Sequence, residues 1–368
     1  MAFTTILLKL LGLLAFVLGV YGIAVVRYRK GKRLGWVITL VLALLFGWLS
    51  LQYGAEVELD RVRYAGHYEG GYDVSYNSWG LNWYFEFCRS LGLGTEGMFQ
   101  VFSTFCFLAI LVSYNLSRQA TPLALLLLLM SQCFVFCFSI IKQGISESLV
   151  MVALVLLFNI VYQEKRSATV ALMVAIVLLT GVAIIFHEAA YIMIPVLLML
   201  AMWNNKAVRV VGYVGIAFGL VAFGWLRSQY AAHIGNYSET LAEQSAAYVQ
   251  GPTVVKNLLE AGKGIPMYIV ATVGVAGRKW MGEKIENYDR YLCLAVLCSA
   301  IYLVSVVVVW YARFAYYLLF PVYVFAAQMI KTSREEGRRP WWLYGAVAVA
   351  IILQVRNFIL YFVNFGGF

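Results

Sequence analysis

The chain has 368 residues, of which 62% are hydrophobic and 12% charged, and its formal net charge at pH 7 is +10. This composition excludes a soluble globular protein, because a single apolar core within a water-facing shell does not use so many apolar residues. A transmembrane barrel is excluded as well, since barrel strands alternate apolar and polar residues whereas this chain has long unbroken apolar runs. The sequence therefore predicts an all-α, polytopic membrane protein.

The apolar runs predict the spans in chain order. A helix of about 20 residues crosses a hydrocarbon core, so there is room for about 12 transmembrane helices in a single domain over residues 1–368. The first run is too long for the core of a signal peptide, and we expect a retained span. The runs at 188–203 and 265–278 are short enough to be broken or re-entrant helices. The predicted spans are 3–26, 34–54, 98–116, 121–141, 145–162, 167–186, 188–203, 207–226, 265–278, 291–310, 312–330 and 341–363.

Basic residues predict the orientation, because Lys and Arg in short connections are retained on the cytoplasmic side. The loop after the first span contains Arg27, Arg29, Lys30, Lys32 and Arg33, and every second connection after it is also basic. We therefore expect both termini on the periplasmic side. The net charge then reflects contact with anionic membrane lipid, and nucleic acid is not an expected partner.

Two long segments lie on the predicted outer side, at 55–97 and 227–264. The first interleaves carboxylates with Tyr and Trp, a combination that fits a sugar, since hydroxyl groups need acceptors and sugar C–H faces stack on rings. An interfacial helix with an aromatic belt uses the same residues to sit at the level of the lipid head groups. Both interpretations stay open at this point.

Ionisable residues also gather at the predicted outer ends of the spans, where the charge rule disfavours cations. Ionisable groups at membrane depth often mark a polar cavity, and cations there fit a lipid-linked phosphate or pyrophosphate, although each one can instead snorkel to the interface. A neutral His accepts a proton near pH 7 and suits a general base, and a satisfied structural His is the alternative. The residues concerned are Lys142, Arg227, Arg313, Arg356, His187 and Glu188.

Short motifs at these positions resemble the EpsG-like branch of the bacterial Wzy-type polysaccharide polymerases. They are RYAG at 63–66 followed by Asp73 and Tyr76, IKQG at 141–144, FHEAA at 186–190 and RFAYY at 313–317 ahead of Pro321. The sequence differs from that family in having Lys142 where Arg is more usual and in a longer spacing between Gly66 and Asp73. A Lys offers a point charge rather than the bidentate fork of Arg.

The resemblance implies a GT-C-like fold and a glycosyltransferase that polymerises O-antigen of lipopolysaccharide, capsule or exopolysaccharide in the inner membrane. Such enzymes transfer a growing glycan from undecaprenyl pyrophosphate onto a lipid-linked repeat unit, without a nucleotide sugar or cofactor, and work beside a chain-length regulator protein. The roles expected here are base for His187 or Glu188, pyrophosphate binding for Lys142, Arg227 and Arg313, and acceptor-sugar binding for Glu69, Tyr72, Asp73 and Tyr76.

Other functions predict different patterns of charge. A flippase or transporter of lipid-linked glycan should spread its charges through mid-span positions, whereas here they gather at one side. An O-antigen ligase-like enzyme, a sugar acyltransferase and a non-catalytic scaffold are further alternatives. The alternating acids Glu56, Glu58 and Asp60 are usually just solvated, and we expect no metal because Arg alone can stabilise a leaving pyrophosphate.

Overall fold

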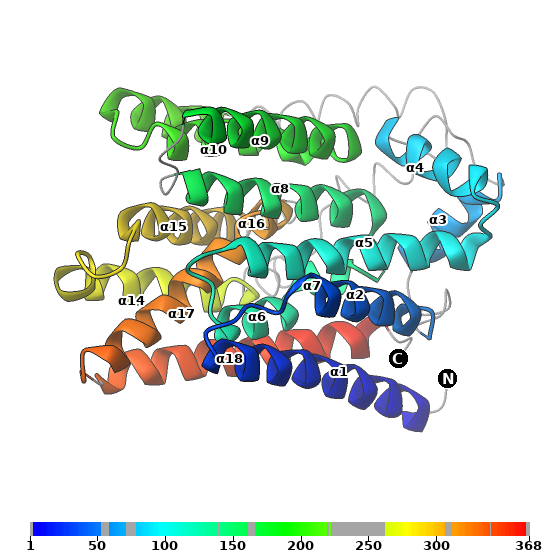
Figure 1. Cartoon of the computed structure of the whole chain (residues 1–368), viewed down its shortest axis with the longest axis horizontal. Helices are drawn as coiled ribbons and strands as arrows, with labels where there is room; N and C mark the ends of the chain where they lie inside the picture. The colour runs from blue at the N-terminus through cyan, green and yellow to red at the C-terminus, as the bar shows by residue number, and fades with distance from the viewer. Residues whose placement is uncertain are drawn as a thin grey trace.

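The computed structural model describes residues 3–52, 59–70, 79–138, 140–160, 166–218, 221, 262–305, 311–338 and 340–365. Throughout these ranges the chain forms helices and the turns that join them, and no strand occurs in them. The predicted all-α class is confirmed for this part of the chain. Figure 1 shows the longer helices running roughly parallel to one another in a bundle.

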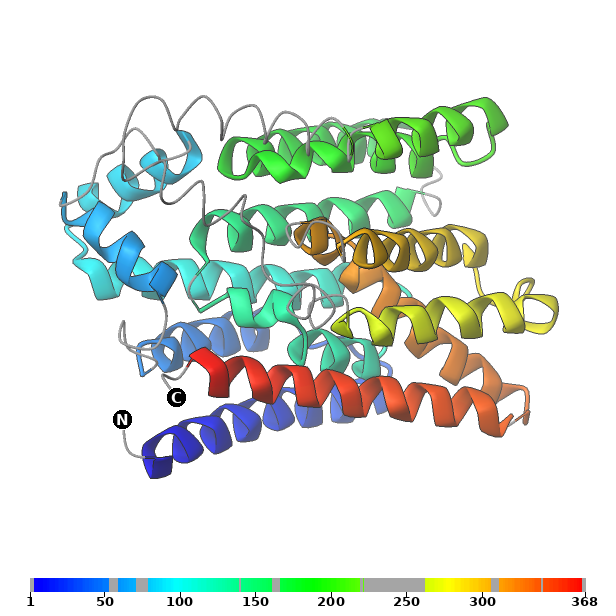
Figure 2. The same ribbon diagram turned by 180° about the vertical axis from the view of Figure 1, so that it is seen from behind.

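Five described helices are long and apolar enough to cross a membrane. Shorter helices run alongside them in the bundle, so we treat the chain as a helical membrane protein (Figures 1 and 2). The number of about 12 crossings stays a prediction, since several predicted spans are shorter helices or broken ones. The long helices are α1 (Phe3–Arg29), α5 (Thr95–Leu116), α8 (Ile141–Ile160), α9 (Arg166–Phe186) and α18 (Trp341–Phe365). The shorter ones include α2 (Trp36–Ser50), α14 (Ile265–Met281), α15 (Tyr288–Val304) and α17 (Leu319–Glu335).

Three predicted spans are divided into two pieces. The run at 121–141 forms α6 (Pro122–Leu129) and α7 (Gln132–Phe136), separated where Ser131 takes an extended backbone with φ −100° and ψ 170°. The run at 188–203 begins with the 3₁₀ turn η3 (Glu188–Ile192) before α10 (Met193–Ala201), as its length had led us to expect. The run at 312–330 forms α16 (Ala312–Tyr316) followed by α17. In contrast, α14 is continuous over 17 residues, so of the two possibilities raised for the short run at 265–278 the broken helix does not occur.

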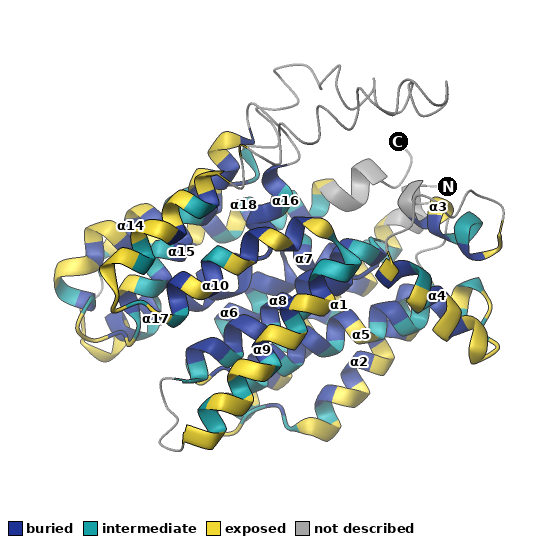
Figure 3. Ribbon diagram, turned by 90° about the horizontal axis from the view of Figure 1, so that it is seen from above, coloured by how far each residue is buried: buried dark blue, intermediate teal, exposed yellow. Residues whose placement is uncertain are grey.

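Helix α8 is the centre of the bundle and packs mainly against α5 and α9. Within the most apolar window of α8, 67% of residues are buried inside the protein, against 22% in α1 and 17% in α9. Figure 3 shows the corresponding exposed faces on the outer helices. These faces carry large apolar side chains such as Leu18, Val37 and Val177, which is the surface expected to contact lipid.

The described basic connections lie at one end of the bundle, on the left in Figure 1. They join α1 to α2, α5 to α6 and α14 to α15, and the end of α17 with Arg334 lies there as well. The start of α1 and the end of α18 lie at the opposite end. The connections predicted to share one side of the membrane therefore lie at one end of the bundle, as far as the structure describes them. We call these the basic end and the opposite end.

The segment 55–97, predicted as a long loop, contains two amphipathic helices at the opposite end: α3 (Leu59–Tyr68) and α4 (Trp79–Ser90). Arg61 on α3 is only 4% exposed, with its guanidinium 4.4 Å above the ring of Phe99 and a hydrogen bond to the carbonyl of Ser50. This part of the segment is thus packed onto the spans. The second predicted segment, 227–264, lies outside the described residues as far as residue 261.

Candidate functional site

The first two turns of α8 bring polar side chains into the centre of the bundle at the opposite end. Gln143, Ser146, Glu147 and Ser148 are all buried here. Gly144 allows this close packing, because a Cβ atom at that position would lie 2.9 Å from Cζ of Phe102 and 3.3 Å from the carbonyl oxygen of Phe136. Three neighbouring helices, α5, α7 and α8, therefore meet around the polar turn.

Glu147 is the buried carboxylate of this cluster and is 3% exposed. The amide of Gln143, one turn earlier, donates a hydrogen bond of 2.6 Å to Oε1 of Glu147. Its other oxygen, Oε2, is buried and has no hydrogen-bond partner among the described residues. A buried charge is costly unless it is paired, and the positive charge of Arg313 on α16 acts on this carboxylate.

Tyr317 connects α8 with the end of α9. Its hydroxyl lies 3.0 Å from Oγ of Ser146 and 3.4 Å from Nδ1 of His187. Tyr317 follows Arg313 by four residues in a stretch of helical backbone, so both side chains project from the same face of α16. The structure thus brings Arg313 and His187, two of the predicted site residues, to one place beside Glu147.

His187 and Glu188 differ in their surroundings although they are adjacent. His187 has an extended backbone, with φ −149° and ψ 114°, between α9 and η3, and its side chain is half-buried. Glu188 is exposed. The contact with Tyr317 therefore favours His187 over Glu188 as the residue that acts in the cluster.

Helix α4 supports this end of α9. A Cβ atom on Gly80 would lie 2.9 Å from Cα of Phe186 and 2.8 Å from its Cγ, so the backbones of α4 and α9 approach closely there. Phe186 immediately precedes His187. The position of His187 thus depends on the packing of α4 as well as on Tyr317.

The other residues predicted for the site are less closely associated with the cluster around Tyr317. Lys142 is half-buried at the start of α8, next to the polar turn. Glu69 is exposed at the end of α3, where it accepts a hydrogen bond of 2.7 Å from Thr95 at the start of α5. Arg227, Tyr72, Asp73 and Tyr76 lie outside the described residues.

No group of three or more His, Cys, Asp or Glu side chains in the described ranges is arranged to bind a metal ion. Glu56 and Glu58 fall outside these ranges, and the side chain of Asp60 is not described. The expectation of no metal therefore stays a prediction.

The sequence analysis did not single out Glu147. The feature of the sequence that could have identified Glu147 is a carboxylate four residues after Gln143 within an otherwise apolar span. An ionisable group in such a span marks a functional position by default. Ser146 was missed too, because a hydroxyl in a span usually bonds only to its own helix.

Together, the cluster offers a cation, a carboxylate and an imidazole at one end of the bundle. That set can stabilise a leaving anion and accept a proton.

The comparisons with known proteins agree with the motifs. The family model described as the EpsG family matches residues 32–365. Neither the curated proteins nor the solved structures contain a match to this chain.

Proposed function

We propose that this chain, which belongs to the EpsG family, is a Wzy-type glycan polymerase. The family consists of membrane proteins similar to polysaccharide polymerases. The proposed donor is a glycan linked to polyprenyl pyrophosphate. The observation that supports this most directly is the contact of the Tyr317 hydroxyl with His187 and Ser146, next to the buried Glu147 and four residues after Arg313. These groups come from α16, α8 and the α9–η3 junction, and they match the requirements of one reaction.

In the proposed reaction, a hydroxyl of the acceptor repeat unit attacks the anomeric carbon of the growing glycan. The bond from that carbon to the pyrophosphate oxygen breaks, and the lipid pyrophosphate leaves with the bonding electron pair. Arg313 and Lys142 bind the departing pyrophosphate, and Arg227 is proposed to join them. Charge-assisted hydrogen bonds are the strongest available for this purpose, and a guanidinium can form two at once.

His187 is the proposed base for the acceptor hydroxyl. In the tautomer with the proton on Nδ1, this nitrogen donates to the hydroxyl of Tyr317, which in turn donates to Ser146. The other ring nitrogen, Nε2, is then the one that accepts the proton. Tyr317 is thus a positioning residue, and Glu147 positions Arg313. Glu188 is the second choice for the base.

We further propose the acceptor site, the substrate and the place of the protein in the cell. Glu69, Tyr72, Asp73 and Tyr76 bind acceptor sugar, and no cofactor or nucleotide sugar takes part. The protein lies in the inner membrane with about 12 spans, a GT-C-like fold, periplasmic termini and its site on the periplasmic face. An undecaprenyl-pyrophosphate-linked oligosaccharide is the substrate, and a chain-length regulator is a partner.

The test is to incubate the purified protein with the undecaprenyl-pyrophosphate-linked repeat unit of its host and separate the products by size. A ladder of longer glycans without added nucleotide sugar supports a polymerase. Absence of a ladder, together with movement of that lipid across liposome membranes, contradicts it and favours a transporter. Transfer of glycan to a different lipid acceptor without chain extension favours a ligase.

A further inference from the structure

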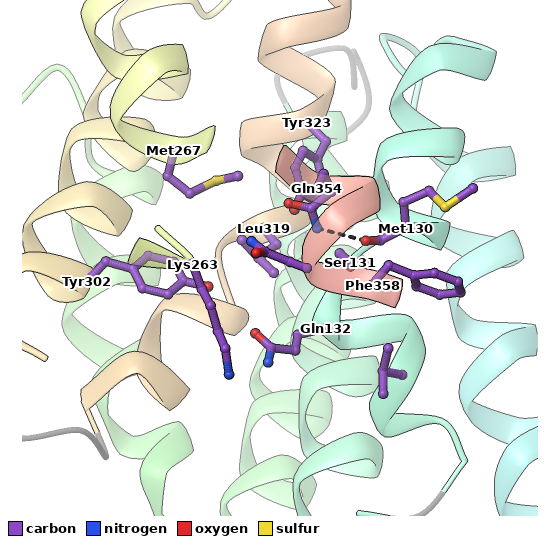
Figure 4. Close-up of a pocket in the computed structure, with 12 residues that line it drawn as sticks. Met130, Ser131, Gln132, Lys263, Met267, Tyr302, Leu319, Tyr323, Gln354 and Phe358 are labelled. Atoms are coloured by element: carbon purple, nitrogen blue, oxygen red, sulfur yellow. Dashed lines mark hydrogen bonds between the residues drawn. The ribbon is translucent and has the colours of Figure 1, made fainter. Parts of the chain in front are cut away.

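The pocket on the other side of α7 from the candidate site is too small for a second ligand. It lies between α7, α14, α15, α17 and α18 and has room for about one water molecule (Figure 4). The amide of Gln354 there donates a hydrogen bond of 2.9 Å to the carbonyl of Met130, at the end of α6. This contact satisfies a carbonyl at the break between α6 and α7. The features that point to a second ligand lie elsewhere, at the basic end.

Two arginines of the basic end are half-buried and have no acidic partner in the described part of the chain. Arg209 and Arg290 form no ion pair there and no side-chain hydrogen bond. Asp289, which precedes Arg290 in the sequence, pairs with Arg278 at 3.1 Å instead. A guanidinium that is partly removed from water is stabilised by an anion, whereas an exposed cation such as Lys206 keeps its hydration. The two arginines therefore have the surroundings of an anion site.

The two arginines also lie at the same level on neighbouring helices. The helix over 206–218 follows α10, which runs back from the candidate site, so this helix starts at the basic end, as α15 does (Figure 1). The two helices meet where the hydroxyl of Tyr213 lies 3.3 Å from Sγ of Cys293. Arg209 precedes Tyr213 by four residues and lies on the same face, about 6 Å nearer the basic end. Arg290 precedes Cys293 by three residues and lies about 4.5 Å nearer that end. We call this junction of the two helices, with its two cations, the arginine seam.

Apolar side chains continue the arginine seam toward the middle of the bundle. Ala217 follows Tyr213 by four residues, Val296 follows Cys293 by three, and both are exposed. At the basic end, the ring of Trp203 lies beside the guanidinium of Arg209, with 5.2 Å between the guanidinium carbon and the ring centroid. Trp and Tyr are typical of the level of the lipid head groups. Cations at that level with exposed apolar side chains beyond them match a lipid with a negative head group and hydrocarbon chains.

We propose that the arginine seam binds an anionic phospholipid of the leaflet at the basic end. Its phosphate lies between Arg209 and Arg290, and an acyl chain lies along Tyr213, Ala217 and Val296. A guanidinium binds a phosphate with two parallel hydrogen bonds. Two cations favour a lipid with a net negative charge over a zwitterionic one, whose own ammonium group offsets its phosphate. The proposal does not depend on the proposed polymerase reaction, because the arginine seam lies at the other end of the bundle from the candidate site.

The experiment measures lipid retention by native mass spectrometry on the purified protein, with phosphatidylglycerol and phosphatidylethanolamine of the same acyl chains as separate probes. Arg209→Gln and Arg290→Gln should each weaken retention of phosphatidylglycerol about tenfold, the loss expected for charge-assisted hydrogen bonds. Arg209→Lys keeps the charge without the fork and should lose less than Arg209→Gln. Arg29→Gln, an exposed arginine at the end of α1, is the matched control and should leave retention unchanged. The thermal midpoint of each variant shows that it is folded.

The outcomes separate a specific site from general attraction to a basic surface. Preference for phosphatidylglycerol in the wild type, reduced in both seam variants and kept in Arg29→Gln, supports the proposal. Equal retention of the two lipids by the wild type would overturn it, and so would losses in Arg209→Gln and Arg290→Gln no larger than that in Arg29→Gln. Because the readout is binding, it is independent of whether the protein forms a glycan ladder.

Discussion

The hydroxyl of Tyr317 lies 3.4 Å from Nδ1 of His187, although the two residues are 130 positions apart in the chain. The same hydroxyl reaches Ser146, so one phenol joins three helical segments. Tyr317→Phe removes this oxygen and keeps the ring. We expect the polymerisation rate to fall about tenfold to hundredfold, because general base catalysis by His187 is then weakened but not removed.

The pH profile separates this role from a purely structural one. A protonated imidazole cannot accept a proton, so the wild-type rate should fall as the pH is lowered, and the residual rate of His187→Gln should lose this acid limb. Tyr317→Phe should keep the limb but move its midpoint. Tyr344→Phe, near the basic end of α18, is the matched control and should behave as wild type. An unchanged acid limb in His187→Gln would exclude His187 as the base.

Glu147 and Arg313 should act as a unit. Arg313→Gln removes the proposed pyrophosphate contact and should lower the rate by about 10²- to 10³-fold. Glu147→Gln should lower it by about tenfold to hundredfold, since the amide keeps the volume but no longer orients the guanidinium. The double variant should be no slower than Arg313→Gln alone, because coupled residues are not additive. Losses that multiply in the double variant would show that Glu147 acts independently of Arg313.

Gly80 should be sensitive to the smallest added side chain. A Cβ atom there meets the backbone of Phe186, so Gly80→Ala must move α4 away from α9 at a cost of about 1–3 kcal/mol. Gly181→Ala in α9 is the control, because nothing lies within 4 Å of its Cβ position. Thermal unfolding in detergent, followed by size-exclusion chromatography, should show a lower midpoint for Gly80→Ala only. Equal midpoints would mean that α4 is not packed on α9 in this way.

The orientation can be tested by cysteine labelling of exposed positions at the two ends. Glu283 follows α14 at the basic end, and Glu96 lies in the first turn of α5 at the opposite end. With a membrane-impermeant maleimide, Glu96→Cys should react in intact cells once the outer membrane is opened, and Glu283→Cys only after the inner membrane is permeabilised. The reverse pattern would place the candidate site on the cytoplasmic face.

Composition and charge predicted the helical class and the shared end of the basic connections, because both depend on transfer of side chains into lipid and not on packing detail. The breaks at Ser131 and before α17 were not predicted, since the apolar runs continue through them. Conversely, α14 is continuous although its apolar run is short, and its last turn carries Arg278 and Lys279.

Part of the candidate site could be expected from the sequence for a similar reason. Lys142, His187 and Arg313 were recognised because a charged residue at a span end stands out in the sequence. Glu147 and Ser146 lie deeper, and their role depends on which face of α8 meets α16, which periodicity alone does not give. The distinction between His187 and Glu188 also required the turn at η3, where adjacent residues point to different surroundings.

The proposed function requires that the cluster around Tyr317 catalyses glycan polymerisation. The most direct measurement is ladder formation from the lipid-linked repeat unit by wild type, Arg313→Gln and His187→Gln, each shown to be folded by its thermal midpoint. We expect a ladder from the wild type and almost none from either variant. Ladders of wild-type length and rate from both folded variants would contradict it.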